Sequence, residues 1–128
     1  MRIDAHGLHY RALNEKINQL ILKGEKTFHL SRVNGQRFIG DGLKGKIKIT
    51  IDGVPGNDLA AFMDGPRIRV KGNAQDGVAN TMNEGEVVID GNAGDVLGFA
   101  MRGGRVFVRG SVGYRVGIHM KSYQKKVP

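Results

Sequence analysis

The segment GDGLKGK, residues 40–46, is the stretch of this chain whose spacing most resembles a known chemical motif. It contains both G-x-G-x-x-G and G-x-x-x-x-G-K, the glycine spacings of two phosphate-binding loops. Such loops direct backbone N–H groups and a helix N-terminus at phosphate. Here Ile47 stands where the second motif needs a serine or threonine, and the strand-like run KIKITID follows in place of a helix. We therefore interpret the segment as a tight corner of the fold.

Histidine and methionine side chains could supply metal ligands. Only His6 and His9 lie near each other in sequence, and the chain has no cysteine to complete a zinc site. Methionines recur at a fixed interval, which favours core filling over a soft-metal site. The histidines are His6, His9, His29 and His119.

Three aspartates, Asp58, Asp76 and Asp95, fall at turns between expected strands. Asp76 and Asp95 are 19 residues apart, and this periodic placement indicates turn chemistry rather than acid–base catalysis. No nucleophile is paired with a base, and no cofactor fingerprint is present. We therefore predict no catalytic, cofactor-binding or metal-binding residue in this chain, which leaves its status as an enzyme uncertain.

The elements that position these residues repeat every 19 residues from Gly53 onwards, and four copies align without a gap. Such a period marks a repeat architecture. The first residue of each copy is glycine, the seventh is aliphatic, the eighth is small, the eleventh is methionine, and the sixteenth and eighteenth are β-branched. These columns are Gly53, Gly72, Gly91, Gly110; Leu59, Val78, Leu97, Val116; Ala60, Ala79, Gly98, Gly117; Met63, Met82, Met101, Met120; Ile68, Val87, Val106; and Val70, Ile89, Val108.

The repeat predicts the fold class. Each copy ends in an alternating run such as RIRVK, EVVID or RVFVR, which is typical of a half-buried strand. No helical pattern fits between these runs, so equivalent strands of successive coils must lie parallel. We predict an all-β chain: a single-stranded, right-handed parallel β-helix with 19-residue coils and a short capping α-helix at its N-terminus. The aliphatic and methionine columns should face inward, and the glycines should provide positive φ at corners.

Charged columns are expected on the outside of this solenoid. The nineteenth position alternates in sign, and opposite charges on neighbouring strands stabilise the pairing modestly. The fifteenth position is less well balanced. The two columns are Asp52, Lys71, Asp90, Arg109 and Lys48, Arg67, Glu86, Arg105.

The first 27 residues differ in kind from the repeat. Leu13 and Ile17 begin an apolar stripe that predicts a helix from about Tyr10 or Asn14 to Lys23, followed by Gly24 as the glycine that ends it. We expect this helix to cap the open end of the first coil, because an uncovered end exposes strand edges. Whether it packs on its own solenoid or on a neighbour stays open.

The early coils are less regular. Counting back 19 residues from Ile47 and Ile49 gives Phe28 and Leu30, which places Arg32 beneath Ile51, where an apolar residue belongs. At the other end, Lys125 and Pro128 do not continue the array. We predict one domain over residues 1–128, with a helical cap at 1–27, the β-helix at 28–121 and a tail at 122–128.

Composition bounds the cell compartment and the partners. The chain has 128 residues, no cysteine, no apolar run of membrane length and no signal-like start, so we expect a soluble cytoplasmic protein. The net charge of +8 raises nucleic acid as a partner. The basic residues, however, are spread along the chain and alternate with acids, and stacking aromatics are few, which argues against nucleic acid as a partner. The one local cluster is Lys121, Lys125 and Lys126.

The glycine pattern resembles a known family. The spacing G-x-x-G-x-x-x-G occurs at Gly91–Gly98 and again at Gly110–Gly117, and each time a methionine follows. With the leading segment NGQRFIGDGLKGKIKITIDGVPGNDLAAFMDG, nearly the whole chain is similar to the C-terminal GXGXG β-helix domain of the glutamate synthase large (alpha) subunit, in the stand-alone form of that domain. The second coil departs locally, with Gln75 where the other coils have glycine.

The resemblance implies a function that the repeat does not. Glutamate synthase transfers the amide nitrogen of glutamine to 2-oxoglutarate, forming glutamate, and is an oxidoreductase. The resemblance implies a non-catalytic scaffold that holds amidotransferase and FMN synthase modules. FMN, iron–sulfur and a reductant such as NADPH would then belong to partner subunits, with no cofactor in this chain. A β-helix subunit of formylmethanofuran dehydrogenase and an independent basic binding module are the alternatives. Oligomeric state, including a homo-oligomer, and the interface used stay open.

Overall fold

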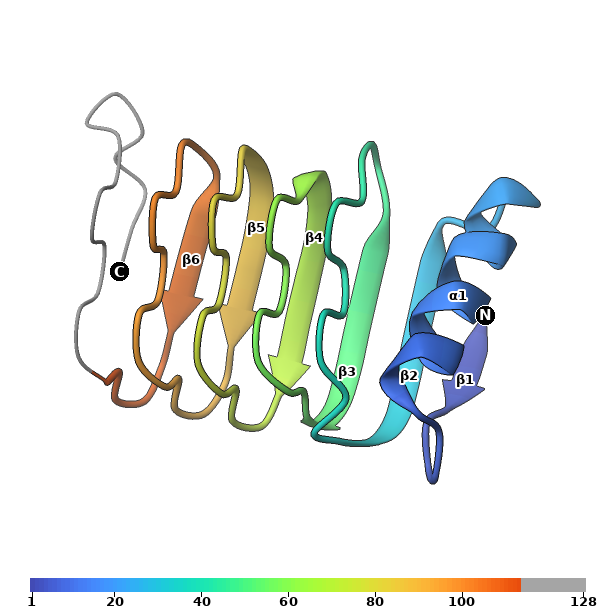
Figure 1. Ribbon diagram of the computed structural model, residues 1–128, viewed down its shortest axis with the longest axis horizontal. Coiled ribbons are helices and arrows are strands. Elements are labelled where there is room, and N and C mark those ends of the chain that lie inside the picture. Colours follow the sequence, from blue (N-terminus) through green and yellow to red (C-terminus); the bar gives the residue numbers. More distant parts are fainter. Residues whose placement is uncertain (114–128) are drawn as a thin grey trace.

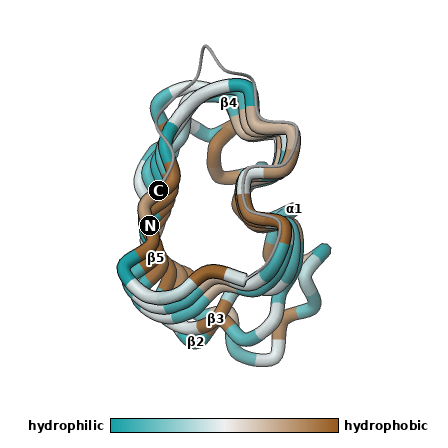
Figure 2. The backbone as a smooth tube through the Cα atoms, turned by 90° about the vertical axis from the view of Figure 1, so that its left-hand side faces the viewer, coloured by the Kyte–Doolittle hydropathy of each residue, from teal (hydrophilic) through white to brown (hydrophobic). Residues whose placement is uncertain are grey.

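The structure is a right-handed parallel β-helix closed at one end by a helix (Figure 1). A computed structural model describes residues 1–113 of the chain. Its strands form one parallel sheet in chain order, and the connecting segments return along the opposite side of each coil. Viewed along the axis, successive coils superpose (Figure 2). The elements are β1 (Arg2–Asp4), α1 (Tyr10–Leu22), β2 (Thr27–Asn34), β3 (Lys48–Val54), β4 (Asp64–Lys71), β5 (Glu84–Ile89) and β6 (Arg105–Val108).

The predicted 19-residue register is confirmed over the four strands from β3 to β6. Lys48 pairs with Arg67, Arg67 with Glu86, and Glu86 with Arg105. Because side chains alternate along a strand, this register stacks every inward residue on its equivalent in the next coil. The alternation of β-branched and charged residues therefore becomes an apolar lumen and a charged outer face.

The predicted interior columns are also confirmed within the described residues. The seventh-position aliphatics and the methionines are almost fully buried in every coil, and the methionines are completely so. The strand columns are buried as well, except Val108 of β6, which is only partly buried and packs against the core. Val116 and Met120 lie outside the described residues. The buried set is Leu59, Val78, Leu97, Met63, Met82, Met101, Ile68, Val70, Val87, Ile89 and Val106.

The predicted alignment of the first coils is wrong by two residues. Phe28 pairs with Ile49, and Leu30 pairs with Ile51, so the offset between β2 and β3 is 21 residues instead of 19. An irregularity between Leu30 and Val33 then shifts the register. Arg32 lies within it, with a left-handed φ of 53°, and is exposed. The bulge turns this charged side chain out of the lumen, which removes the conflict that a strict 19-residue count created.

The bulge at Arg32 also ties the first two strands together. Its Nε donates a hydrogen bond of 3.0 Å to Asp4 Oδ1 on β1, and a second guanidinium nitrogen pairs with the other oxygen. This hydrogen bonding lowers the pKa of Asp4 to about 2. Strand β1 itself was not predicted. It pairs in parallel with β2, with Ile3 opposite Leu30, so residues 1–27 contain a strand as well as a helix.

The helix α1 is the crossover between β1 and β2, and it covers the N-terminal end of the solenoid (Figure 1). Its Leu13 and Ile17 are buried in the same apolar core as the strands, so the helix packs on its own solenoid. Asn14 Nδ2 donates to the carbonyl of Arg37 at 2.9 Å, which fixes the helix against the first coil. The helix ends as predicted, with Gly24 at φ 99° donating to the Ile21 carbonyl at 2.9 Å.

Glycines in the repeat have two different roles, and only one was predicted. At the eighth position Gly98 has φ 70°, and Ala60 and Ala79 share this left-handed conformation, which explains why the column is small. Gly91 and Gly110 lack a positive φ. A Cβ on Gly91 would lie 2.8 Å from the carbonyl oxygen of Gly72, so the side chain is excluded by the neighbouring coil. For Gly91 and Gly110 the prediction of a positive φ is therefore wrong, whereas Gly53, the first glycine of this column, has φ 121° as predicted.

Candidate interface on the outer face of the solenoid

The phosphate-loop-like segment is a corner of the solenoid, as predicted. Gly40, Gly42 and Gly45 have φ values of 80°, 69° and 87°. The N–H groups of Gly42 and Gly45 donate to carbonyls of the next coil at 2.8 and 3.0 Å. These two donors are therefore engaged by protein, and a strand follows where a phosphate loop would have a helix.

Asp41, inside this corner, has a perturbed pKa that the sequence analysis missed. Its Oδ1 accepts a 2.8 Å hydrogen bond from the N–H of Ala61. Burial raises its pKa to about 8, and the charge of Asp58 adds to the rise. The adjoining cavity of about 20 Å³ also touches Asn14 and Asn18 of α1, and such a space holds one water at most. Asp41 is thus a structural carboxyl that links two coils.

The histidines of the described chain have separate roles. His9 is the N-cap of α1, and its Nδ1 accepts from the N–H of Arg11 at 3.2 Å. His29 on β2 pairs with Asp52 on β3, and this hydrogen bond lowers the pKa of Asp52. His6 is exposed, and His119 lies outside the described residues. Over residues 1–113, no group of three or more histidine, cysteine, aspartate or glutamate side chains is placed to hold a metal ion.

The periodic aspartates form a ladder with asparagine. The N–H of Asp76 donates to Asn57 Oδ1 at 3.1 Å, and the N–H of Asp95 donates to Asp76 Oδ1 at 2.7 Å. A second ladder joins Asn73, Asn92 and Ser111 at 2.8 Å per step. Each side-chain oxygen thus satisfies a backbone donor one coil further on, which supports the prediction of a turn role.

These ladders explain the glycine spacing. A Cβ on Gly94 would lie 2.1 Å from Asp76 Oδ1, and a Cβ on Gly91 would lie 2.2 Å from Asn73 Oδ1. A Cβ on Gly110 would lie 2.1 Å from Asn92 Oδ1, and one on Gly113 would lie 2.0 Å from Asp95 Oδ1, the next oxygens of the same ladders. The two glycines of the motif G-x-x-G are therefore the positions at which a side chain would overlap the asparagine or aspartate oxygen of the preceding coil. Asp58, the neighbour of Asn57 in the chain, restricts Gly77 in the same way, because a Cβ there would lie 2.4 Å from Asp58 Oδ1.

The C-terminal ends of the strands carry paired charges. Arg69 on β4 contacts Asp90, just after β5, at 3.1 Å, and Arg109 approaches the same carboxylate at 3.8 Å. Of the alternating charges predicted for the nineteenth position, Asp90 and Arg109 thus form an ion pair. Such exposed pairs contribute about 0.2–1 kcal/mol each.

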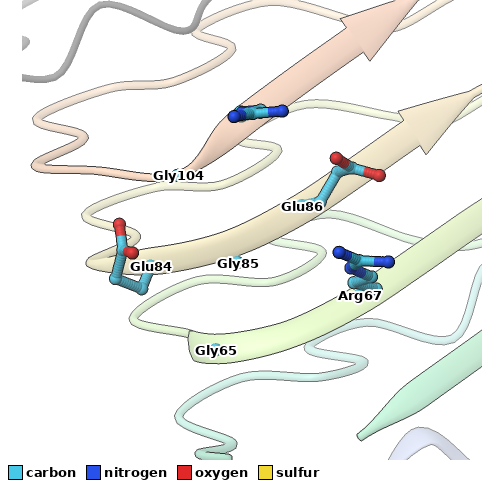
Figure 3. A pocket seen from close by; sticks show the side chains of 7 residues that line it. Gly65, Arg67, Glu84, Gly85, Glu86 and Gly104 are labelled. Carbon is cyan, nitrogen blue, oxygen red and sulfur yellow. The ribbon is translucent and has the colours of Figure 1, made fainter. Parts of the chain in front are cut away.

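The N-terminal ends of the strands form a groove instead. Two hollows of about 430 and 460 Å³ adjoin each other, sharing Gly65 and Arg67, and together they cross the starts of β2 to β6. Figure 3 shows Arg67 on β4 and Glu86 on β5 side by side on the outer face. Gly65, Gly85 and Gly104 lie at the starts of β4, β5 and β6, and Glu84 lies beside Gly85. The groove was not predicted. We define the strand-start groove by Lys26, Thr27, Lys46, Ile47, Lys48, Gly65, Arg67, Glu84, Gly85, Glu86, Gly104 and Arg105.

Within residues 1–113, the one carboxyl whose pKa is strongly raised is that of the partly buried Asp41, which accepts a hydrogen bond from backbone, and the histidines lie apart from one another. In residues 1–113, no helix has the length and apolar character needed to cross a lipid bilayer. What the arrangement can do is present a rigid, charged face across five strands.

Comparison with known proteins gives the family. The GXGXG motif family matches residues 24–127 of this chain. A protein of Methanocaldococcus jannaschii, described as uncharacterized, is 57% identical over 129 aligned positions, covering 98% of this chain and 49% of that relative. The chain thus spans about half the length of the curated relative it matches. No solved structure matches. The chain belongs to the GXGXG motif family, the domain found in the large subunit of glutamate synthase.

Proposed function

We propose that this protein is a non-catalytic scaffold of a glutamate synthase-type complex, which forms glutamate from glutamine and 2-oxoglutarate. The main support for this proposal is the match of the GXGXG motif family to residues 24–127. The inter-coil hydrogen bonds support it, because a stack of coils joined by backbone bonds and side-chain ladders gives the rigidity that a scaffold needs.

The partners in this proposal are an amidotransferase subunit and an FMN-binding synthase subunit. FMN, the iron–sulfur cluster and the site of the reductant would belong to those subunits. This chain would hold the two modules at a fixed separation in the cytoplasm. Among residues 1–113, the charged side chains of the strand-start groove form no ion pair, and they are the feature best suited to docking, since charge complementarity sets the register between partners.

The test is reconstitution. The amidotransferase and synthase polypeptides are purified without this chain, and glutamate formation from glutamine and 2-oxoglutarate is followed with and without it. Glutaminase activity and ammonia-dependent synthesis are measured separately on the same samples. We expect this chain to raise glutamine-dependent synthesis while leaving both partial activities unchanged. Glutaminase or synthase activity in this chain by itself, or no effect on the coupled rate, would contradict the proposal.

A further inference from the structure

We propose that the strand-start groove binds an extended acidic segment of a protein partner, with carboxylates over Lys48 and Arg67. The inference rests on the proposed scaffold function and assigns it a docking surface. It begins from the distribution of charge. The half of the groove that crosses β2, β3 and β4 is lined by four cations and no acid: Lys26, Lys46, Lys48 and Arg67.

These cations have no partner within the part of the chain that the structure describes. Within residues 1–113, the ion pairs join Arg32 with Asp4 and both Arg69 and Arg109 with Asp90, and a hydrogen bond joins His29 with Asp52. None involves a side chain of the strand-start groove. The same outer face therefore carries satisfied charges at the ends of its strands and unsatisfied ones at their starts. The positive side chains remain available for an external carboxylate.

The floor of the groove admits a chain closely. Gly65, Gly85 and Gly104 line it, and each has a positive φ and a backbone neighbour in the preceding coil. A Cβ on Gly104 would lie 2.6 Å from the Gly85 carbonyl oxygen, so this floor stays free of side chains. Five strands at about 4.8 Å spacing give a length of roughly 19 Å, which fits about six residues of extended peptide.

Lys48 and Arg67 form the centre of the site. They are directly paired residues of β3 and β4, both exposed, so their side chains stand one strand spacing apart on the same face. Carboxylates of residues i and i+2 in an extended segment lie on one side of it, roughly 6.6 Å apart. Flexible lysine and arginine side chains can meet such a pair from adjacent strands, and arginine can do so with two hydrogen bonds.

The other half of the groove favours protein over nucleic acid. Glu84 and Glu86 line it together with Arg105. A phosphate backbone carries a negative charge at every step, and these two carboxylates would repel it. A peptide can instead place acidic residues over the cations and a basic residue near the glutamates. A second copy of this chain is a poor occupant because each copy carries a net charge of +8.

The first experiment measures peptide binding to the full chain by fluorescence anisotropy. The probe is a labelled peptide of four glutamates followed by two lysines. The comparison probes are the same peptide with glutamines for glutamates, and a hexanucleotide of single-stranded DNA. We expect the acidic peptide to bind most tightly, and its affinity to fall as salt rises. Equal binding of the glutamine peptide, or tighter binding of the DNA, would overturn the proposal.

Charge reversal locates the site. Lys48→Glu combined with Arg67→Glu should weaken peptide binding about tenfold, because two attractions become repulsions. The matched control, Arg11→Glu with Lys16→Glu, makes the same change in net charge on exposed residues of α1 outside the groove. Arg11 lies in the first turn of α1, where a glutamate is favoured, and Lys16 is an exposed helical position that accepts glutamate, so this control should fold. Circular dichroism and thermal unfolding verify both proteins. Equal loss of affinity in the two variants would overturn the proposal.

The same variants in the reconstituted complex separate this inference from the proposed function. If the wild-type chain is retained by the amidotransferase and synthase subunits and the groove variant is lost, the docking surface is supported. If wild type and groove variant are retained equally, the groove inference fails while the scaffold function stands. If wild-type chain is not retained by either subunit, the scaffold function fails, and the peptide measurement alone decides the groove.

Discussion

Adding one methyl group at Gly94 separates the two roles of glycine in this fold. The added Cβ would lie 2.1 Å from Asp76 Oδ1, 2.9 Å from the carbonyl carbon of Gln75 and 3.0 Å from the Asp76 nitrogen. Rotation of the aspartate could relieve the first contact, but the other two involve backbone. Gly94→Ala must therefore push two coils apart where they are joined by hydrogen bonds.

The cost follows from the bonds lost. Separation at Gly94 breaks its 3.1 Å hydrogen bond to the Gln75 carbonyl and the 2.7 Å bond from Asp95 N–H to Asp76 Oδ1. At about 1 kcal/mol for each bond, the free energy of unfolding should fall by about 2 kcal/mol, and residual overlap adds to this. For a chain of this length, Tm should fall by roughly 8 °C.

The matched control is Gly35→Ala. Gly35 has φ 80°, but a Cβ there meets no atom within 4 Å, so only the left-handed backbone is penalised. That penalty is about 1–2 kcal/mol, and the lower entropy of the unfolded alanine chain offsets about 0.4–1 of it. Urea unfolding followed by circular dichroism gives both values. A loss for Gly35→Ala as large as that for Gly94→Ala would refute the steric role assigned to the motif.

Three further predictions concern the core, the ladder and the partly buried Asp41. Met82→Ala should lower the free energy of unfolding by about 2–5 kcal/mol in urea titrations, because this fully buried side chain leaves a cavity between coils. Asp76→Ala should cost about 1 kcal/mol and Asp76→Asn much less, since asparagine retains an oxygen for Asp95 N–H; equal losses would argue against the ladder. Asp41→Asn should have the same free energy of unfolding as wild type near pH 4. Its stability relative to wild type should then increase with pH up to about pH 8. The folded-state pKa of Asp41 is raised to about 8, so the wild-type chain loses stability as pH rises through this interval. A pH-independent difference in urea midpoint between variant and wild type would contradict that assignment.

The regular coils could be predicted because their sequence signal is strong and local. From Lys48 to Val108 each inward residue has a chemical equivalent 19 positions away, and a slip of one residue would turn the aliphatic columns outward. Strand β1 gave no such signal. It has only three residues, and a helix rather than a turn separates it from β2. The two-residue error at β2 arose because the first coil is longer than 19 residues: the bulge at Arg32 accounts for one extra residue, since the offset to β3 falls from 21 at Leu30 to 20 at Val33, and the other lies in the segment that connects β2 to β3.

The candidate interface was beyond sequence reasoning for a different reason. The residues of the strand-start groove come from five strands, and adjacent ones are about 20 positions apart in the chain. The unbalanced column of Lys48, Arg67, Glu86 and Arg105 was visible, but not whether its charges were paired. Whether two charges pair depends on the distances between side chains of neighbouring strands. The steric glycines were likewise hidden, since Gly91 and Gly98 look alike in sequence yet only Gly98 needs a left-handed φ.

The most direct test of the scaffold function is affinity isolation from native extract with this chain as bait, followed by identification of the retained proteins by mass. The scaffold account predicts a glutaminase-like polypeptide together with an FMN-binding, synthase-like polypeptide, both lost at high salt. Recovery of a molybdopterin-type enzyme would contradict it in favour of the formylmethanofuran dehydrogenase alternative. Recovery of nucleic acid with neither enzyme would contradict it in favour of a basic binding module.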